Sequence, residues 1–199
     1  MRADTLSFYE DNAASLCAKY DVAGMDWLYD KVCQVIPQGG SILDVGCGSG
    51  RDARRLSQLG YEVTACDASS QMLHHAKMTS DDGHINYLLR QFPLSNDDNL
   101  LTLKFDGIIS IAMLMHLSRN ECVQIVRQVS NMLSGGGFFI ASWCSNRSED
   151  PRNLREMSSG EFVSDILGSG LTVEGVTANK DSFGRAIVWH TVFSRKGGG

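Results

Sequence analysis

The sequence lacks the features of a secreted or membrane protein. No run of apolar residues approaches the roughly 18 that cross a bilayer, and the N-terminus has no apolar signal core. Six cysteines are present without any C-x-x-C pair, so neither a disulfide scaffold nor a metal site is expected. We therefore expect a cytoplasmic protein with no membrane contact and no bound metal.

Clustered positive charge is also missing. The 18 Lys and Arg residues include no run of four, and 23 acidic residues bring the net charge to −5. Such a chain disfavours a polyanionic partner, so no nucleic acid is expected. The length of 199 residues suits one domain, predicted over 1–196, and the glycines at 197–199 are expected to form a disordered tail.

One glycine-rich stretch has the pattern of a ligand site. Residues 41–45 form an apolar run typical of a buried parallel strand, and Gly46, Gly48 and Gly50 follow it before a helix expected over 51–59. Glycines let a ligand approach the backbone, and the start of a helix offers N–H groups. A strand, a glycine turn and a helix in this order predict a ligand at the turn.

The residues around the turn indicate which ligand is bound. A second strand predicted over 61–66 places Asp67 beside the glycines, where a carboxylate could accept both hydroxyls of a ribose. Dinucleotide folds need a third glycine in G-x-G-x-x-G, but Arg51 occupies that position. Asp44 would repel a pyrophosphate and tolerates an ammonium group. The pattern disfavours a different nucleotide-dependent enzyme, such as an oxidoreductase, which is kept as an alternative.

The segment Asp44-Val45-Gly46-Cys47-Gly48-Ser49-Gly50, followed by Asp67, resembles the nucleotide-binding signature of class I S-adenosylmethionine-dependent methyltransferases. The resemblance extends from Phe8 to Arg195. It implies a Rossmann-like, doubly wound α/β fold, with a mostly parallel seven-stranded sheet, an antiparallel last strand and helices on both faces. It also implies S-adenosyl-L-methionine as cofactor and S-adenosyl-L-homocysteine as product.

The remaining chain supplies elements for this fold. Hydrophobic patterns predict helices over 5–36, over 71–77 behind a Ser69 or Ser70 cap, from Ser118 to the glycines at 135–137, and over 158–167. Strands are predicted over 85–89, 105–111, 138–143, 171–176 and 186–193. A turn is expected at 81–83 and an acidic surface loop at 95–101.

The resemblance also implies the cofactor contacts. Residues 1–40 would cover the site, with Tyr9 either touching the methionine end of the cofactor or packing as a core aromatic. Arg51 could pair with the methionine carboxylate or remain a solvated cation. The thioether of Met72 would pack on the adenosine. The other candidates in the cofactor site are Asp44, Gly46, Cys47, Gly48, Asp67, Ala68, Gln91, Phe92, Ser110 and Ala112.

The sequence departs from the family pattern after the third predicted strand. Most relatives carry an acid there that binds the adenine amino group, whereas this chain has Arg90-Gln91-Phe92-Pro93. Backbone groups of Gln91 and Phe92, or the Gln91 amide, could still bind the adenine edge.

Methyl transfer is an in-line displacement that depends mainly on alignment, and it needs a base only where the acceptor must lose a proton. His116 follows the fourth predicted strand and is the candidate base or acceptor-orienting group, with a purely structural role as the alternative. The polar segment 144–160 is predicted to be an acceptor lid or, alternatively, a plain connector.

The residues after the fourth predicted strand favour a small acceptor. Ser110-Ile111-Ala112-Met113 is apolar and small, and it lacks the Asn/Asp-Pro-Pro-Tyr motif used on amide nitrogens. The sequence therefore predicts a methyltransferase that acts on a small molecule. A methyltransferase for RNA or protein, and a non-catalytic module that binds the cofactor or a partner, remain alternatives.

Overall fold

The structure is a computed structural model that describes residues 2–80, 83–145, 150, 152, 154–181 and 185–198. Residues 81 and 82 of the predicted turn, residue 199 of the predicted tail, and residues 146–149, 151 and 153 of the predicted lid lie outside the described residues.

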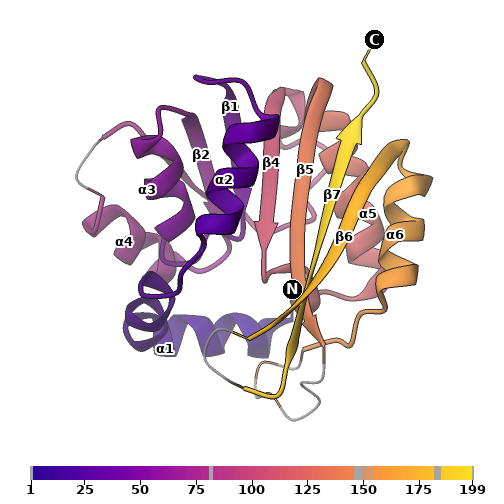
Figure 1. Ribbon diagram of the computed structural model, residues 1–199. Helices are drawn as coiled ribbons and strands as arrows, with labels where there is room; N and C mark the ends of the chain where they lie inside the picture. The colour runs from indigo at the N-terminus through magenta and orange to yellow at the C-terminus, as the bar shows by residue number, and fades with distance from the viewer. Residues whose placement is uncertain are drawn as a thin grey trace.

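A seven-stranded sheet in the order β3-β2-β1-β4-β5-β7-β6 forms the centre of the molecule (Figure 1). Neighbouring strands from β3 to β5 run parallel, and β7 lies antiparallel between β5 and β6. The strands are β1 Ser41–Val45, β2 Glu62–Asp67, β3 Asn86–Leu89, β4 Phe105–Ile111, β5 Leu133–Ser145, β6 Leu171–Lys180 and β7 Val188–Lys196. The predicted fold class, including the antiparallel last strand, is confirmed.

Helices cover both faces of the sheet. One core contains residues of α2 and α3 packed on β1, β2 and β4, and a second contains residues of α5 and α6 packed on β4, β5 and β7. The helices are α1 Ala3–Asp21, α2 Asp26–Val35, α3 Arg51–Gln58, α4 Ser70–Met78, α5 Arg119–Met132 and α6 Ser159–Gly168, with 3-10 turns η1 Asn99–Thr102 and η2 Leu114–His116.

Two predicted elements need correction. The helix expected to reach the glycines at 135–137 ends at Met132, and β5 begins at Leu133 because Leu133 adopts an extended backbone and pairs with Phe105. The segment 95–101 is not simply a surface loop. It enters the turn η1, which buries Leu100 in the core.

The carboxyl ends of the parallel strands meet at one edge of the sheet. Figure 1 shows α1 lying across this edge, at the end to which the arrow of β4 points. The chain runs from β1 outward to β2 and β3 and then returns to β4 on the other side of β1. This reversal is the point where open α/β sheets form their ligand crevice.

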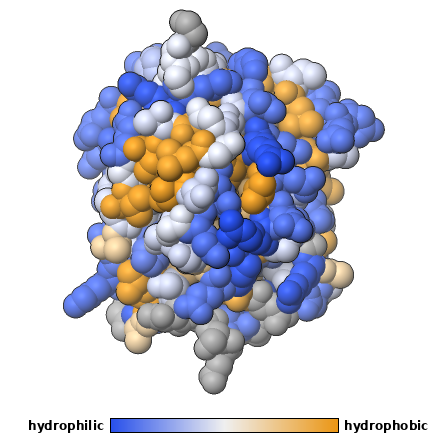
Figure 2. All heavy atoms as spheres, turned by 90° about the vertical axis from the view of Figure 1, so that its right-hand side faces the viewer, coloured by the Kyte–Doolittle hydropathy of each residue, from blue (hydrophilic) through white to orange (hydrophobic). Residues whose placement is uncertain are grey.

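The opposite side of the sheet ends in the edge strand β6. Figure 2 shows this side, where hydrophilic side chains separate the apolar patches. Leu167 and Val176 are exposed here, and an Arg195–Glu174 ion pair of 3.6 Å joins β7 to β6. Charged residues along an edge strand hinder pairing with another chain.

The predicted cap of α5 provides a stability test. The Ser118 hydroxyl accepts from the Glu121 N–H (3.3 Å), and the Glu121 carboxylate accepts from the Ser118 N–H (2.8 Å). Ser118→Ala should lower the free energy of unfolding by about 1 kcal/mol, because the Glu121 N–H at the helix start loses its side-chain acceptor. Urea unfolding would measure the change. Ser164→Ala on the exposed face of α6 is the control, and an equal loss in both variants would contradict the capping role.

Candidate cofactor and acceptor site

A cavity of about 630 Å³ opens at the carboxyl edge, between the loops that follow β1, β2 and β4. Its size is in the range of small-molecule and cofactor sites. All but one of the predicted site residues line it, namely Tyr9, Asp44, Gly46, Cys47, Gly48, Arg51, Asp67, Ala68, Met72, Gln91, Phe92, Ala112 and His116. The exception is Ser110, which does not line the cavity because its side chain is fully buried and its hydroxyl donates to the Val45 carbonyl (3.2 Å).

The turn after β1 depends on glycine. Gly46 has a φ of +78°, and a Cβ atom there would lie 2.4 Å from Cγ of Met113, which is on the loop after β4. The Gly46 and Cys47 N–H groups both donate to the Cys66 carbonyl at the end of β2 (2.8 and 2.9 Å). The turn is therefore fixed between β2 and β4, with its backbone exposed to the cavity.

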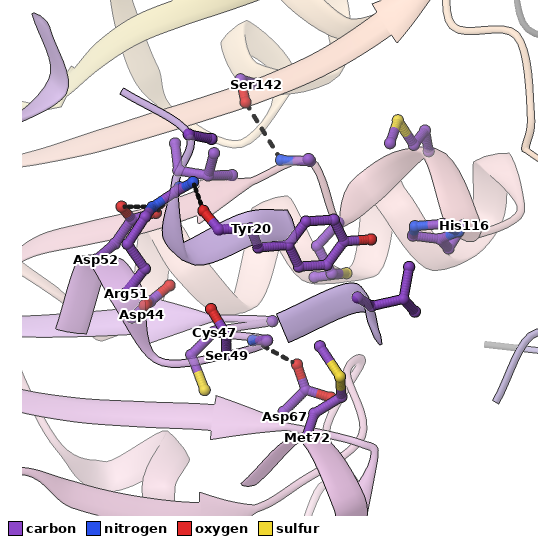
Figure 3. A pocket seen from close by; sticks show the side chains of 18 of the residues that line it. Tyr20, Asp44, Cys47, Ser49, Arg51, Asp52, Asp67, Met72, His116 and Ser142 are labelled. Atoms are coloured by element: carbon purple, nitrogen blue, oxygen red, sulfur yellow. Dashed lines mark hydrogen bonds and ion pairs between the residues drawn. The ribbon is translucent and has the colours of Figure 1, made fainter. Parts of the chain in front are cut away.

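Asp67 is bound by backbone groups. Its carboxylate accepts from the Gly48 N–H (2.8 Å) and from the Ser69 N–H (2.9 Å), as Figure 3 shows for the first contact. Burial raises the pKa of Asp67, and the backbone hydrogen bonds offset only part of that shift. Each carboxylate oxygen has a second lone pair, so the group can still accept from a ligand hydroxyl.

Asp44 lines the cavity and has a buried carboxylate oxygen without a hydrogen-bond partner among the described residues. The residue is 2% exposed, and this oxygen is its Oδ2. Burial raises the pKa of Asp44 well above its usual value, and the charges of Asp52 and Asp67 raise it further while Arg51 lowers it. A cationic donor placed at this oxygen would supply the missing partner.

Arg51 is neither solvated nor unpaired. Its guanidinium binds the Asp52 carboxylate through two contacts (2.9 and 2.8 Å) and donates to the Tyr20 carbonyl (3.0 Å), as Figure 3 shows. The Asp52 carboxylate also accepts from the Tyr29 hydroxyl (2.7 Å). The alternative of a solvated cation is therefore wrong, because only 19% of the Arg51 side chain is exposed. Three of its five N–H donors are used, so two can meet a ligand.

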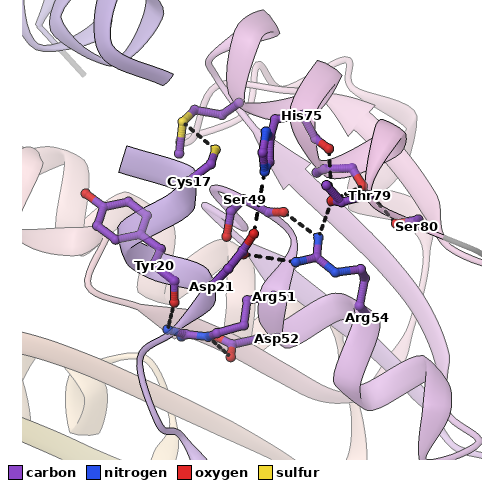
Figure 4. A network of polar contacts seen from close by, with 12 residues as sticks. Cys17, Tyr20, Asp21, Ser49, Arg51, Asp52, Arg54, His75, Thr79 and Ser80 are labelled. Atoms are coloured by element: carbon purple, nitrogen blue, oxygen red, sulfur yellow. Dashed lines mark hydrogen bonds and ion pairs between the residues drawn. The ribbon is translucent and has the colours of Figure 1, made fainter. Parts of the chain in front are cut away.

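A polar network attaches the end of α1 to the glycine turn. Arg54 donates to the Ser49 carbonyl (2.6 Å) and pairs with Asp21 (2.9 Å), while His75 of α4 lies 3.5 Å from the other Asp21 oxygen (Figure 4). Glu10 contributes a further attachment, because its carboxylate accepts from the Ser70 N–H at the start of α4 (2.6 Å). These contacts fix α1 beside the cavity.

The departure after β3 has a local explanation. Arg90, which stands where an acid was expected, pairs with Asp98 at 2.8 Å, and the Arg90 N–H donates to the Asp67 carbonyl (2.9 Å). Asp98, in the acidic segment 95–101, thus compensates the charge of Arg90. Gln91 and Phe92 line the cavity as predicted, together with Met72 of α4.

The backbone is strained where β4 ends. Ala112 has a φ of +61°, a conformation that costs a residue with a Cβ on the order of 1 kcal/mol. Its N–H donates to the Ser142 carbonyl (3.0 Å) and lies 3.2 Å from the Ser142 hydroxyl, which Figure 3 shows. This turn directs the chain into η2 and places Met113 against the glycine turn.

The far end of the cavity combines aromatic and charged side chains. The Tyr9 hydroxyl lies 3.0 Å from Nε2 of His116, and Arg152 donates to the hydroxyls of both Tyr9 and Tyr20 (3.3 Å each). Asp150 binds the same guanidinium through two contacts of 2.7 Å. Figure 3 shows the Tyr20 hydroxyl directed toward the end of the cavity where His116 lies.

A second ion pair lies at this end of the cavity. Asp181 pairs with Arg185 and accepts from the Trp189 indole N–H (2.9 Å), and all three residues line the cavity. Hydrogen bonds from Arg185 and Trp189 hold the pKa of Asp181 well below its usual value, although burial opposes them.

The chain resembles known methyltransferases in sequence and in fold. A family model described as a methyltransferase domain matches residues 42–137. A probable S-adenosyl-L-methionine-dependent methyltransferase, TehB of Haemophilus influenzae, is 26% identical over 134 residues, which are 67% of this chain and 46% of the relative. A ubiquinone biosynthesis O-methyltransferase of Alkalilimnicola ehrlichii is 29% identical over 134 residues, 67% of this chain and 52% of the relative. The chain spans about half the length of the curated relatives it matches.

Among solved structures, a TehB-like S-adenosylmethionine-dependent methyltransferase from Corynebacterium glutamicum superposes with a TM-score of 0.68 at 20% identity, covering 96% of this chain and 97% of that chain. Residues 42–137 therefore match a methyltransferase domain, and the relatives and the fold support the class I S-adenosylmethionine-dependent type. The cofactor of that family is S-adenosylmethionine, as the resemblance of the glycine turn and Asp67 to the family signature implied.

Several residues that line the cavity were not predicted from the sequence. Tyr20 had a usable signal, because it follows Tyr9 by eleven residues on one helix, about three turns, and so shares its face. Arg152 lies in the segment 144–160 predicted as a lid, but neither its own side chain nor Asp181 and Trp189 gave such a signal, because they reach the cavity from segments more than 100 residues away from the glycine turn. Only the tertiary fold brings them to it.

The described residues show neither a metal-binding cluster nor a membrane-spanning helix. Within the part of the chain that the structure describes, no group of three or more His, Cys, Asp or Glu side chains is arranged to hold a metal ion. Across the same residues, none of the helices combines the length and apolar character needed to cross a membrane.

The burial of the Asp44 carboxylate should lower the free energy of unfolding, and a substitution can test this. Asp44→Asn should raise the free energy of unfolding at neutral pH, because it removes a buried charge near Asp52 and Asp67. The folded pKa of Asp44 is raised, so its stabilising contribution is present at low pH and is lost as the pH rises through that pKa. The advantage of Asp44→Asn over the wild type should therefore grow with pH. Urea unfolding at about pH 5 and pH 8 checks this, and a constant difference would contradict it.

Proposed function

We propose that this protein binds S-adenosylmethionine in the cavity at the carboxyl edge and transfers its methyl group to a small-molecule acceptor by in-line displacement. The observation that carries the proposal is the buried carboxylate of Asp44, a residue that lines the cavity and whose Oδ2 has no hydrogen-bond partner in the described structure. An ammonium group such as that of the cofactor's methionine part supplies the charge and the donors that this oxygen lacks.

The other residues of the turn fit the rest of the cofactor. The two oxygens of Asp67 can each accept one ribose hydroxyl while keeping their backbone donors. The two remaining N–H groups of Arg51 suit the methionine carboxylate, which would join the Asp52 carboxylate on the same guanidinium. Met72, Phe92 and Gln91 surround the space left for the adenine. The neighbouring lining comes from four residues of the turns after β1 and β2, namely Gly46, Cys47, Gly48 and Ala68.

When bound, the sulfonium of the cofactor supplies an electrophilic methyl group. The protein then has to hold the acceptor in line with it and exclude water. Ala112 and Met113 lie at the end of β4 beside the glycine turn, and the tyrosines of α1 close the cavity from the other side. We assign residues 1–196 to one methyltransferase domain, with 1–40 as the cover of the cofactor and 144–160 as the acceptor lid.

The lid assignment is supported by contacts of its described residues. The Arg152 carbonyl accepts from the Thr5 hydroxyl (3.1 Å), and the Arg155 N–H donates to the Met115 carbonyl (2.7 Å). The segment therefore contacts both α1 and η2 across the acceptor end of the cavity. A cavity covered in this way favours a small acceptor over RNA or protein. The relative named as an O-methyltransferase of ubiquinone biosynthesis is consistent with a small acceptor.

Calorimetric titration tests the cofactor site. The wild type should bind S-adenosylmethionine and S-adenosylhomocysteine, and Asp67→Ala should weaken both by about 1–3 kcal/mol, or roughly 5- to 150-fold, because the ribose hydroxyls lose their acceptors. Asp30→Ala, on the exposed part of α2 and outside the cavity, removes the same charge and is the control.

Circular dichroism would establish that both variants are folded. Absence of binding by the folded wild type would refute the proposed function. Equal affinities of the wild type and Asp67→Ala would refute the ribose role of Asp67 alone.

A further inference from the structure

The contact between Tyr9 and His116 indicates how the acceptor is activated. Tyr9 comes from α1 and His116 from η2, and the fold brings the Tyr9 hydroxyl within 3.0 Å of Nε2 of His116. Their rings lie perpendicular, with centroids 5.4 Å apart. Both residues line the cavity beside Met113 and Ala112, next to the proposed position of the methyl group.

The neighbouring arginine fixes the direction of this hydrogen bond. Nη1 of Arg152 donates to the Tyr9 oxygen (3.3 Å), and a guanidinium cannot accept, so the Tyr9 proton has to be donated elsewhere. Nε2 of His116 is the most basic acceptor in contact with that hydroxyl, more so than the phenol oxygen of Tyr20. We therefore assign the tautomer of His116 in which Nε2 carries the lone pair and accepts from Tyr9.

The two residues differ in access to the cavity. His116 is 6% exposed, while Tyr9 is only partly buried. The nitrogen that could act as a base is already bonded to the Tyr9 hydroxyl, so an acceptor reaches it through Tyr9. This changes the prediction from sequence, in which His116 itself contacted the acceptor.

We propose that Tyr9 takes the proton of the methyl acceptor while passing its own proton to His116, and that the acceptor is therefore a hydroxyl or thiol compound. This inference rests on the proposed methyltransferase function. The acceptor X–H bond breaks and its proton moves to the Tyr9 oxygen, as the Tyr9 O–H proton moves to Nε2 and forms an imidazolium. The electron pair left on X forms the bond to the methyl carbon, and the C–S bond breaks with its electrons going to sulfur. The imidazolium then releases its proton to water.

The charges around the pair suit this transfer. Burial raises the pKa of Tyr9, as does Tyr20, while Arg152 lowers it. The phenol therefore stays protonated at neutral pH and has to give up its proton as it receives another. The Arg152 guanidinium, itself neutralised by Asp150, contacts the Tyr9 oxygen on which negative charge develops. Arg155 from the same segment donates to the Leu117 carbonyl, beside His116 (3.0 Å).

Methyl transfer to catechol and to 2-mercaptoethanol provides the test, with labelled S-adenosylmethionine as donor. Tyr9→Phe keeps the ring and removes the hydroxyl, and His116→Gln keeps a hydrogen-bonding side chain that cannot take up a proton. Each should lower kcat at about pH 7 by roughly 100-fold or more, with the affinity for S-adenosylhomocysteine unchanged within about threefold. Tyr20→Phe is the matched control, because it removes the other hydroxyl that Arg152 contacts.

The pH dependence separates proton transfer from a structural role. At about pH 10 catechol loses a proton without help, so the loss caused by Tyr9→Phe or His116→Gln should shrink to less than about tenfold. Any loss in Tyr20→Phe should not depend on pH. A loss that is the same at both pH values, or no loss, overturns the proposed transfer. Binding of S-adenosylhomocysteine without transfer to either probe by the wild type overturns the acceptor class, whereas absence of binding overturns the proposed function instead.

Discussion

Three carboxylates share the buried space at the ends of β1 and β2, and their mutual repulsion is the constraint on which the rest of the site depends. Asp44, Asp52 and Asp67 all line the cavity, and the last two raise the pKa of the first. Two of the charges are satisfied within the protein. Asp52 has Arg51 and the Tyr29 hydroxyl, and Asp67 has the N–H groups of the glycine turn. The Asp44 Oδ2 has no partner among the described residues, so a cation bound beside it would favour the ionised carboxylate.

The position of α1 follows from the same constraint. Arg51, held by Asp52, donates to the Tyr20 carbonyl and so binds the last turn of α1. Asp21 at the end of that helix pairs with Arg54 of α3, and Glu10 in its middle binds the start of α4. The helix that supplies Tyr9 and Tyr20 is therefore positioned by residues of the cofactor end. A change in how the carboxylates are neutralised would move the acceptor end as well.

Local sequence patterns predict the end of the cavity at the glycine turn and Asp67. They do not predict the other end, around His116 and Arg152. The turn from Asp44 to Arg51 and the acid at Asp67 are close in the chain, so their spacing predicted the ligand-binding edge of the sheet, and their resemblance to the family signature implied the cofactor. Ser110 was misplaced because strand periodicity does not say how far a strand extends before its side chains reach the cavity. The end of α5 was misplaced because the pairing of Leu133 with Phe105 overrides local helix preference. Arg152 and Trp189 meet the cavity only through contacts over long sequence distances.

The two ends of the cavity differ in how a substitution would affect them. Residues of the glycine turn are constrained by backbone geometry, since a Cβ at Gly46 meets Met113 and the neighbouring N–H groups are already bonded to Cys66. The acceptor end is instead built from long side chains on α1, on the segment around Arg152 and on β7. Exchanging one of these side chains alters contacts inside the cavity and leaves the backbone of the turn unchanged. Substitutions at the acceptor end can therefore change acceptor specificity without changing the backbone of the glycine turn. The Tyr9–His116 pair spans both parts, because Tyr9 belongs to the helix anchored by the cofactor end and His116 follows the strained turn at Ala112.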